Sequence, residues 1–269
     1  MEYFTIYKYN DTLYQIKDAL GVLSTLIIGS DKALLFDTGY GIGNLKEEVE
    51  KITTKPLIVV NSHGHMDHAC GNYLFEKVYI HPDDIKLFTE HNGIERRKRN
   101  LVNVKNINKL PEGFDEEGYL HQGVGNLVPL YEGDVFDLGG IKLEVIMMRG
   151  HTSGSIALYN KEEKYLLVGD ATCPFVWLFL KESLPVHVYI KSLQETLKLD
   201  FDNFLVGHGA RMFPRSKMED FLKIAMDIKV EESAQVYFEG YGVDTIYCYT
   251  KGRMYDQDDC GVVYDPLKL

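Results

Sequence analysis

The sequence is poor in cysteine and has no long hydrophobic run. Its four cysteines lie far apart and form no C-x-x-C pair, so neither a zinc knuckle nor a disulfide framework is indicated. A transmembrane helix needs roughly 18–20 consecutive apolar residues, whereas the most hydrophobic window, 174–180, spans seven. No basic region followed by an apolar one opens the sequence, so we expect no signal peptide. These absences predict a cytoplasmic protein that does not enter a membrane.

Basic charge is also scarce. Lysine and arginine together number 29 against 40 aspartates and glutamates, which gives a net charge of −11 at pH 7. Nucleic acids and anionic membranes are themselves negative, so neither is expected as a partner. The 269 residues, 45% hydrophobic and 26% charged, are ordinary for a globular chain that buries a sizeable core. We therefore expect a small-molecule substrate, while the oligomeric state stays open.

Short apolar runs, polar or glycine-rich turns and amphipathic helices recur in both halves of the chain. The predicted strands are 25–28, 33–36, 57–60, 141–147, 155–159 and 165–168, with a later hairpin of 244–249 and 261–264. The predicted helix starts are Asn44, Pro82 and two capping-box pairs, Ser192 with Glu195 and Ser216 with Glu219. Strands in both halves, each half closed by helices, predict an α/β fold of two packed sheets with helices outside, in four layers.

We expect a single domain, 1–269, with one interruption. The segment from about 91 to 129 lacks clear periodicity and is interpreted as an insertion or lid. Its basic run, 96–99, is best explained as a solvated helix end or loop; the alternative is a clamp for an acidic substrate such as a phosphodiester. The apolar run 175–179 either walls a substrate pocket or belongs to the core or a dimer contact.

A histidine or aspartate follows each of four predicted strands. The run 57–60 leads into an H-x-H-x-D-H motif, and the runs 145–148, 166–168 and 204–206 each end two or three residues before a further histidine or aspartate. If these strands lie side by side, the polar side chains converge on one rim, where ligand sites of α/β sheets usually form. The seven residues are His63, His65, Asp67, His68, His151, Asp170 and His208.

Five imidazoles and two carboxylates are a donor set that suits zinc, and also iron or manganese. The set is too rich in nitrogen for calcium or magnesium. A tetrahedral ion takes three or four ligands, so seven ligands fit two ions that share one carboxylate. The sequence therefore predicts two divalent metal ions, with zinc as the first choice.

These motifs resemble those of the metallo-β-lactamase superfamily over most of the chain. The matching segments are Leu34-Leu35-Phe36-Asp37-Thr38-Gly39, the H-x-H-x-D-H loop, Gly150-His151-Thr152-Ser153-Gly154-Ser155, Val168-Gly169-Asp170 and Val206-Gly207-His208. The resemblance implies an αββα sandwich with a dinuclear site between its sheets. In it His63, His65 and His151 would hold the first metal, and Asp67, His68 and His208 the second. Asp170 would bridge the two metals.

Two residues narrow the branch that the chain resembles. True β-lactamases of the family generally lack an aspartate at the bridging place, so Asp170 argues against antibiotic hydrolysis. It is similar instead to the glyoxalase II, lactonase and phosphodiesterase branches. Diiron flavoproteins usually carry an acidic residue where this chain has His65, and the glutathione-binding helices of classical glyoxalase II have no match after His208.

The predicted function is that of a dinuclear metal-dependent hydrolase. Two nearby cations lower the pKa of a water they share towards 7, so we expect a metal-bridging hydroxide to attack a carbonyl ester, thioester or lactone. Asp67, a ligand by family match, is also the catalytic candidate, since it could orient this nucleophile and take up its proton. The alternatives are a phosphodiesterase, an iron-dependent sulfur dioxygenase on the same ligand set, and a non-catalytic metal-binding relative.

Other polar groups receive lesser roles. Asp37 is expected in a turn or beside a ligand, and Thr152 and Ser153 are candidates for orienting His151. The G-x-G-x-G sequence at 39–43 departs from the nucleotide-binding spacing G-x-G-x-x-G, and a tight turn explains it. The chain contains no G-x-S-x-G, Walker A or H-E-x-x-H motif, so rival hydrolase machineries have no support.

Overall fold

The computed structural model of this protein describes residues 3–238, 241, 243 and 245–269. Its first sheet is mixed, with antiparallel pairing from β1 to β4 and parallel pairing from β4 to β7. The strands follow one another in chain order across this sheet. They are β1 (Thr5–Lys8), β2 (Leu13–Lys17), β3 (Leu23–Ile28), β4 (Ala33–Phe36), β5 (Leu57–Val60), β6 (Val78–Ile80) and β7 (Leu127–Pro129).

The second sheet packs against the first and has the order β14-β13-β11-β10-β9-β8. Its pairs are antiparallel except for β11 with β13, which run parallel. The strands are β8 (Val135–Asp137), β9 (Lys142–Met147), β10 (Ile156–Asn160), β11 (Tyr165–Leu167), β13 (Asn203–Leu205) and β14 (Met212–Pro214).

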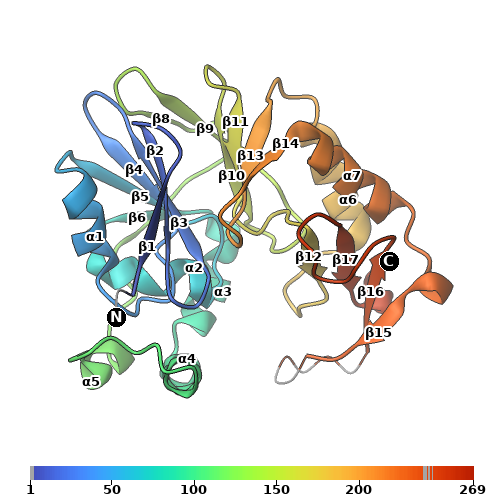
Figure 1. Cartoon of the computed structure of the whole chain (residues 1–269), viewed down its shortest axis with the longest axis horizontal. Helices are drawn as coiled ribbons and strands as arrows, with labels where there is room; N and C mark the ends of the chain where they lie inside the picture. The colour runs from blue at the N-terminus through green and yellow to red at the C-terminus, as the bar shows by residue number, and fades with distance from the viewer. Residues whose placement is uncertain (1–2, 239–240, 242, 244) are drawn as a thin grey trace.

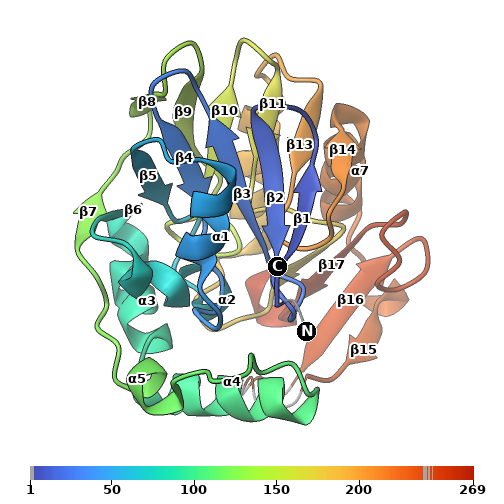
Figure 2. The same ribbon diagram turned by 60° about the vertical axis from the view of Figure 1, so that its left-hand side comes forward.

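Helices cover the outer faces of both sheets, as Figures 1 and 2 show. α1 lies outside the first sheet, and α6 and α7 lie outside the second. The helices are α1 (Leu45–Ile52), α2 (Met66–Ala69), α3 (Ile85–His91), α4 (Ile94–Asn106), α5 (Glu116–Leu120), α6 (Val186–Thr196) and α7 (Arg215–Met226). Short 3₁₀ turns are η1 (Cys70–Leu74), η2 (Pro82–Asp84), η3 (Val230–Glu232) and η4 (Pro266–Lys268).

The alternation of side chains along each strand builds this layering. In β4, Leu34 and Phe36 face the core between the sheets, whereas Leu35 faces the outer cluster that also holds Val49 of α1. In the second sheet, Leu166 faces the cluster beneath α6 and α7, while its neighbours Tyr165 and Leu167 face inward. Both sheets are thus buried on two sides, and the predicted αββα fold is confirmed.

A third sheet has no counterpart in the predicted four layers. It has the order β12-β17-β16-β15, formed by β12 (Phe175–Leu178), β15 (Ala234–Val236), β16 (Ile246–Thr250) and β17 (Gly261–Tyr264). The antiparallel β16–β17 pair is the predicted later hairpin, although Asp244, its expected first residue, lies outside the described residues. The apolar run 175–179 is mostly core, since only Trp177 within it is partly exposed.

The capping-box predictions fare unequally. Asn44 caps α1 as expected, because its side chain accepts from the Glu47 backbone N–H and donates to the Glu47 carboxylate. The prediction at Ser192 is wrong, because α6 begins at Val186 and the Ser192 hydroxyl donates to the Arg149 carbonyl instead. Ser216 likewise lies inside α7, whose N-cap is Pro214.

The segment 91–129 contains more regular structure than its pattern indicated. It forms α4 and α5, and its end, β7, extends the first sheet beside β6. Figure 2 shows α4 running along the lower edge of the molecule, below α2 and α3. Arg97 in the basic run is buried and bonds to the Asn92 and Tyr119 carbonyls, so it is a structural residue rather than part of a solvated or substrate-facing surface.

Candidate metal centre

The seven predicted residues all lie at the carboxyl ends of strands in the two central sheets. β5 runs into a loop in which His63 is buried, and His65 immediately precedes the short helix α2 that carries Asp67 and His68. The second sheet supplies the other three, each just beyond the end of a strand. They are His151 after β9, Asp170 after β11 and His208 after β13. The site therefore straddles the edge where the two sheets meet.

Three imidazoles form the first group. His65 Nδ1 lies 3.0 Å from His63 Nε2 and 2.9 Å from His151 Nε2, and all three rings are buried. Burial is the largest cause of the lowered pKa of His63, and it brings the pKa of His151 to about 4, with neighbouring imidazoles adding to both shifts. The lowered pKa values leave the His63 and His151 rings uncharged at neutral pH, as a cation's nitrogen ligands must be.

The second group pairs two imidazoles with two carboxylates. His68 Nε2 lies 3.3 Å from Asp170 Oδ2 and 3.5 Å from Asp67 Oδ2. His208 Nε2 lies 3.2 Å and 3.4 Å from the same two oxygens. The two groups adjoin, since the rings of His63 and His68 have centroids 4.4 Å apart. Asp170 thus lies with the second group, and its bridging role remains a prediction.

Buried atoms without partners show that this donor set fits a metal. Among the described residues, His68 Nε2 and Asp170 Oδ1 are buried and make no hydrogen bond. Such orphaned groups are costly unless an ion or water satisfies them. Each ligand atom within a group lies within 4.8 Å of the others. Nitrogen and carboxylate donors in this arrangement suit a borderline divalent cation.

The remaining nitrogen of each of the four buried imidazoles in the two groups has an outward partner. This is typical of histidines that bind metals, because the outer hydrogen bond sets the tautomer and the ring orientation. The pairs are His63 Nδ1 with Ser62 Oγ at 2.9 Å, His65 Nε2 with Glu182 Oε1 at 2.7 Å, His68 Nδ1 with Asp37 Oδ2 at 2.8 Å and His151 Nδ1 with the Trp177 carbonyl at 2.8 Å. Asp37 therefore lies beside a predicted ligand, as expected.

Thr152 and Ser153 do not orient His151, contrary to our prediction. The Thr152 hydroxyl donates to Asp84, and the Ser153 hydroxyl to the Asp83 carbonyl. Asp84 is fully buried and also accepts hydrogen bonds from the backbone N–H groups of Gly64 and Gly154. The Asp84 carboxylate therefore links the loop after β5, which contains Gly64, to the loop after β9, which contains Gly154.

Glu182 and His91 are site residues that pattern analysis missed. His91 belongs to no motif, whereas Glu182 follows the apolar run 174–180 at the same offset at which Asp170 and His208 follow theirs, and this offset is the signal that could have found it. The structure brings both to His65, whose ring stacks on His91 with centroids 5.0 Å apart. The sequence does not show that Glu182 pairs with His65, because the two residues are 117 positions apart.

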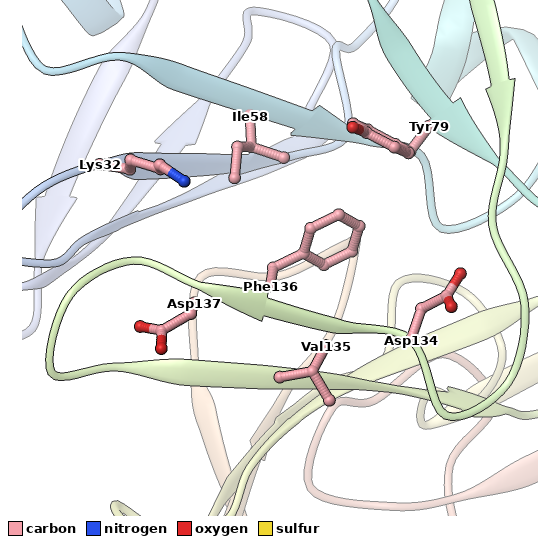
Figure 3. A pocket seen from close by; sticks show the side chains of 7 residues that line it. All are labelled: Lys32, Ile58, Tyr79, Asp134, Val135, Phe136 and Asp137. Atoms are coloured by element: carbon pink, nitrogen blue, oxygen red, sulfur yellow. The ribbon is translucent and has the colours of Figure 1, made fainter.

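A hollow of about 440 Å³ elsewhere is unrelated to this centre. It is lined by residues that include Lys32, Ile58 and Phe136 (Figure 3). Lys32 precedes β4 and Ile58 lies near the start of β5, whereas the predicted metal ligands follow the strand ends. The hollow therefore lies at the opposite end of the first sheet.

The fold and the site together define a class: αββα proteins that gather histidines and aspartates at the shared edge of two sheets to bind metal. A family model of the metallo-beta-lactamase superfamily matches residues 18–213. The chain belongs to the metallo-beta-lactamase superfamily.

Relatives with assigned names point to hydrolases. Human acyl-coenzyme A thioesterase MBLAC2 is 30% identical over 157 residues, which are 54% of this chain and 56% of that protein. A probable metallo-hydrolase of Methanocaldococcus jannaschii is 33% identical over 200 residues, covering 69% of this chain and 86% of that protein. The chain thus spans little more than half the length of the human thioesterase.

Solved structures share the fold at low identity. A metallo-beta-lactamase from Pontibacter korlensis superposes with a TM-score of 0.62 at 16% identity, covering 84% of this chain and all of that one. The stereoselective inverting sec-alkylsulfatase Pisa1 from Pseudomonas sp. gives a TM-score of 0.63 at 17% identity, covering 83% of this chain and 42% of that one. Within the described part of the chain, no helix has the length and apolarity to cross a membrane.

Proposed function

We propose that this protein is a metal-dependent thioesterase that acts on a small-molecule acyl thioester. The observation that carries the proposal is the pair of adjoining donor groups at the joint of the two sheets, three imidazoles beside two imidazoles and two carboxylates. The named relatives, which include acyl-coenzyme A thioesterases, favour a thioester among the carbonyl substrates. Nucleic acid is not proposed as a partner of so acidic a chain.

The donor groups divide the work of holding two cations. The three imidazoles around His65 Nδ1 would hold the first, and Asp67, His68 and His208 the second, with Asp170 between them. Cations in these places supply a water of lowered pKa and polarise a substrate carbonyl. Zinc is our first choice, with iron and manganese as alternatives.

The chain's own residues then position the reactants and move the proton. Asp67 keeps 20% of its side-chain surface exposed, so water can reach this side chain, where the carboxylate would orient the attacking water and take up its proton. Asp37 and Ser62 hold the His68 and His63 rings in place from behind through hydrogen bonds of 2.8 Å and 2.9 Å. Fixed ligands of this kind avoid reorganisation during the reaction.

The proposal is tested with protein produced without added metal and reconstituted separately with zinc, iron or manganese. An acyl-coenzyme A, an oxygen ester, a lactone and a phosphodiester are then compared, with released thiol measured for the first. We expect thioester hydrolysis that depends on the metal and exceeds turnover of the other substrates. If the protein hydrolysed phosphodiesters alone, the thioesterase proposal would be wrong and the protein would be a phosphodiesterase. If the iron-loaded protein consumed oxygen in the presence of persulfides, the protein would be a sulfur dioxygenase and the proposal would again be wrong.

A further inference from the structure

Glu182 makes the outward hydrogen bond of His65, at the centre of the first group. Its Oε1 lies 2.7 Å from His65 Nε2, while His65 Nδ1 faces both His63 and His151. A neutral imidazole carries a single proton. If that proton is at Nε2, His65 donates a hydrogen bond to the Glu182 carboxylate, and the lone pair at Nδ1 is free for a cation.

The turn that carries Glu182, residues 180–184, is fastened to the neighbouring ligand loop. The Ser183 hydroxyl donates to the His151 carbonyl at 2.9 Å, and the Leu184 N–H donates to the Gly150 carbonyl at 2.8 Å. The carboxylate is therefore fixed relative to His151, the ligand that shares the cation with His65.

Lys268, in η4, holds the same turn from the other side. Its ammonium donates to the Ser183 carbonyl at 2.8 Å and also to the Leu180 carbonyl. These carbonyls lie on either side of Glu182, so the lysine closes the turn around it. The positive charge of Lys268 near Glu182 also favours the ionised form of the Glu182 carboxylate, which accepts a hydrogen bond from His65.

His91 restricts the movement of the pair. Its ring stacks on that of His65 with an interplanar angle of 18° and centroids 5.0 Å apart. Its Nε2 lies 3.8 Å from Glu182 Oε1, and its ring is buried. A parallel ring in contact with His65 prevents that imidazole from tilting out of the plane in which Nδ1 points inward.

From this geometry we propose that Glu182 is a positioning residue. It holds His65 with its proton on Nε2 and with Nδ1 directed at the first cation. Lys268 maintains the turn that places Glu182 beside His65. The proposal rests on the metal site of the proposed function. It assigns a metal-supporting role to a carboxylate and a lysine that lie outside the two donor groups.

The first experiment reads the tautomer without metal or activity. Long-range ¹H–¹⁵N spectra of the metal-free full chain report which His65 nitrogen carries the proton. We expect Nε2 in the native protein and a mixture of both tautomers in Glu182→Leu. Glu182→Gln retains an acceptor oxygen at the same reach, so we expect it to restore Nε2. An Nε2 proton in Glu182→Leu, or an Nδ1 proton in the native protein, would overturn the proposal.

The second experiment measures affinity for zinc by chelator competition. Loss of the outer partner of a metal-bound histidine typically costs 10–100-fold in affinity. We expect a loss of about that size for one of two zinc ions in Glu182→Leu, a smaller loss in Lys268→Met, and near-native affinity in Glu182→Gln. The matched control, Glu162→Leu in an exposed turn, should bind zinc normally.

The outcomes separate this inference from the proposed function. Equal zinc affinity in the native protein and Glu182→Leu, or an equal loss in Glu182→Gln, would refute positioning through the hydrogen bond. A third zinc ion that disappears in His91→Phe would make Glu182 a ligand and also refute it, since His65, His91 and Glu182 could themselves hold an ion. If the native chain bound no metal, the proposed function would fail while the tautomer experiment still reported on Glu182.

Discussion

Among single residues, Asp18 shows how burial controls ionisation close to the site. Its carboxylate accepts from the backbone N–H groups of Leu20 and Val22 at 2.9 Å and 3.0 Å, but within the described residues its Oδ2 has no partner. The side chain is only 6% exposed. Burial raises the pKa of Asp18 from 3.8 to about 6, against the opposing effect of these bonds and of the His208 charge.

This raised pKa makes a pH-dependent prediction for the metal-free protein. An acid whose pKa is higher in the folded state contributes stability below its unfolded pKa of about 4, and loses it as the pH rises through 6. Relative to Asp18→Asn, the free energy of unfolding should therefore fall by about 2 kcal/mol between pH 4 and 7. Urea unfolding at several pH values measures this difference. Parallel curves for the two proteins would contradict the prediction, and the exposed Asp31→Asn serves as the control.

Asp170 is the residue on which the dinuclear proposal depends most. Its carboxylate contacts His68 and His208, and its Oδ1 is buried with no hydrogen-bond partner among the described residues. We expect Asp170→Ala to bind one metal ion fewer and to lose at least about 100-fold in turnover, more than the loss of an outer contact causes. Metal analysis and thermal unfolding of the metal-free forms test this. Full activity with unchanged metal content would refute the role, and the exposed Asp11→Ala should behave as the native protein does.

At the scale of elements, α4 presents basic side chains beside the metal centre. Arg96 and Arg99 make no hydrogen bond or ion pair with the residues that the structure describes, unlike Lys98, which pairs with Glu95 at 3.0 Å. Burial raises the pKa of Tyr241; the charge of Asp67 adds to this shift, and those of both arginines oppose it. The charges of Arg96 and Arg99 therefore affect the Tyr241 hydroxyl, and so does the charge of Asp67, a predicted metal ligand.

Two free cations near the site predict selectivity for anionic thioesters. Replacing both Arg96 and Arg99 by glutamine should raise the KM for an acyl-coenzyme A by about 3–10-fold, since each exposed charge contributes up to about 1 kcal/mol. The KM for an uncharged thioester should stay the same. Steady-state kinetics with both substrates provide the test, and Lys98→Gln is the control on the same helix. An equal rise in the KM for the uncharged thioester would show that Arg96 and Arg99 do not act as a clamp for anionic substrates.

The elements also show where local patterns suffice. Asn44 and Glu47 form their capping bonds within one turn of α1, so the sequence predicts that helix start correctly. Ser192 and Glu195 have the same spacing, but α6 already begins at Val186. There the apolar residues Tyr189 and Leu193 are buried against the second sheet, and this tertiary packing decides where the helix starts.

In the whole molecule, the metal centre joins the two central sheets. Loops of the first sheet supply His63, His65, Asp67 and His68, and the second sheet supplies His151, Asp170 and His208. A cation held by both sets links the two halves of the sandwich only when the chain is folded. Metal binding is therefore coupled to folding.

Metal removal should accordingly lower the thermal stability of the entire domain. A ligand at 100 times its Kd adds about 2.7 kcal/mol to folding, which corresponds to roughly 5–10 °C for a chain of this size. We expect a chelator to reduce Tm by this amount and added zinc to restore it. Differential scanning calorimetry measures the change, and Asp170→Ala should respond less. A Tm unaffected by the chelator would show that the two sheets do not depend on metal.

The sequence by itself predicted the seven histidines and aspartates that the structure brings together, because they follow buried strands whose apolar pattern is local. The tertiary structure decided which groups support them. Asp84, Glu182 and His91 carry no motif, and they reach the site only because the chain returns to it from distant positions. Their contacts depend on how loops of two sheets meet, and a local pattern cannot encode a hydrogen bond between residues more than a hundred positions apart.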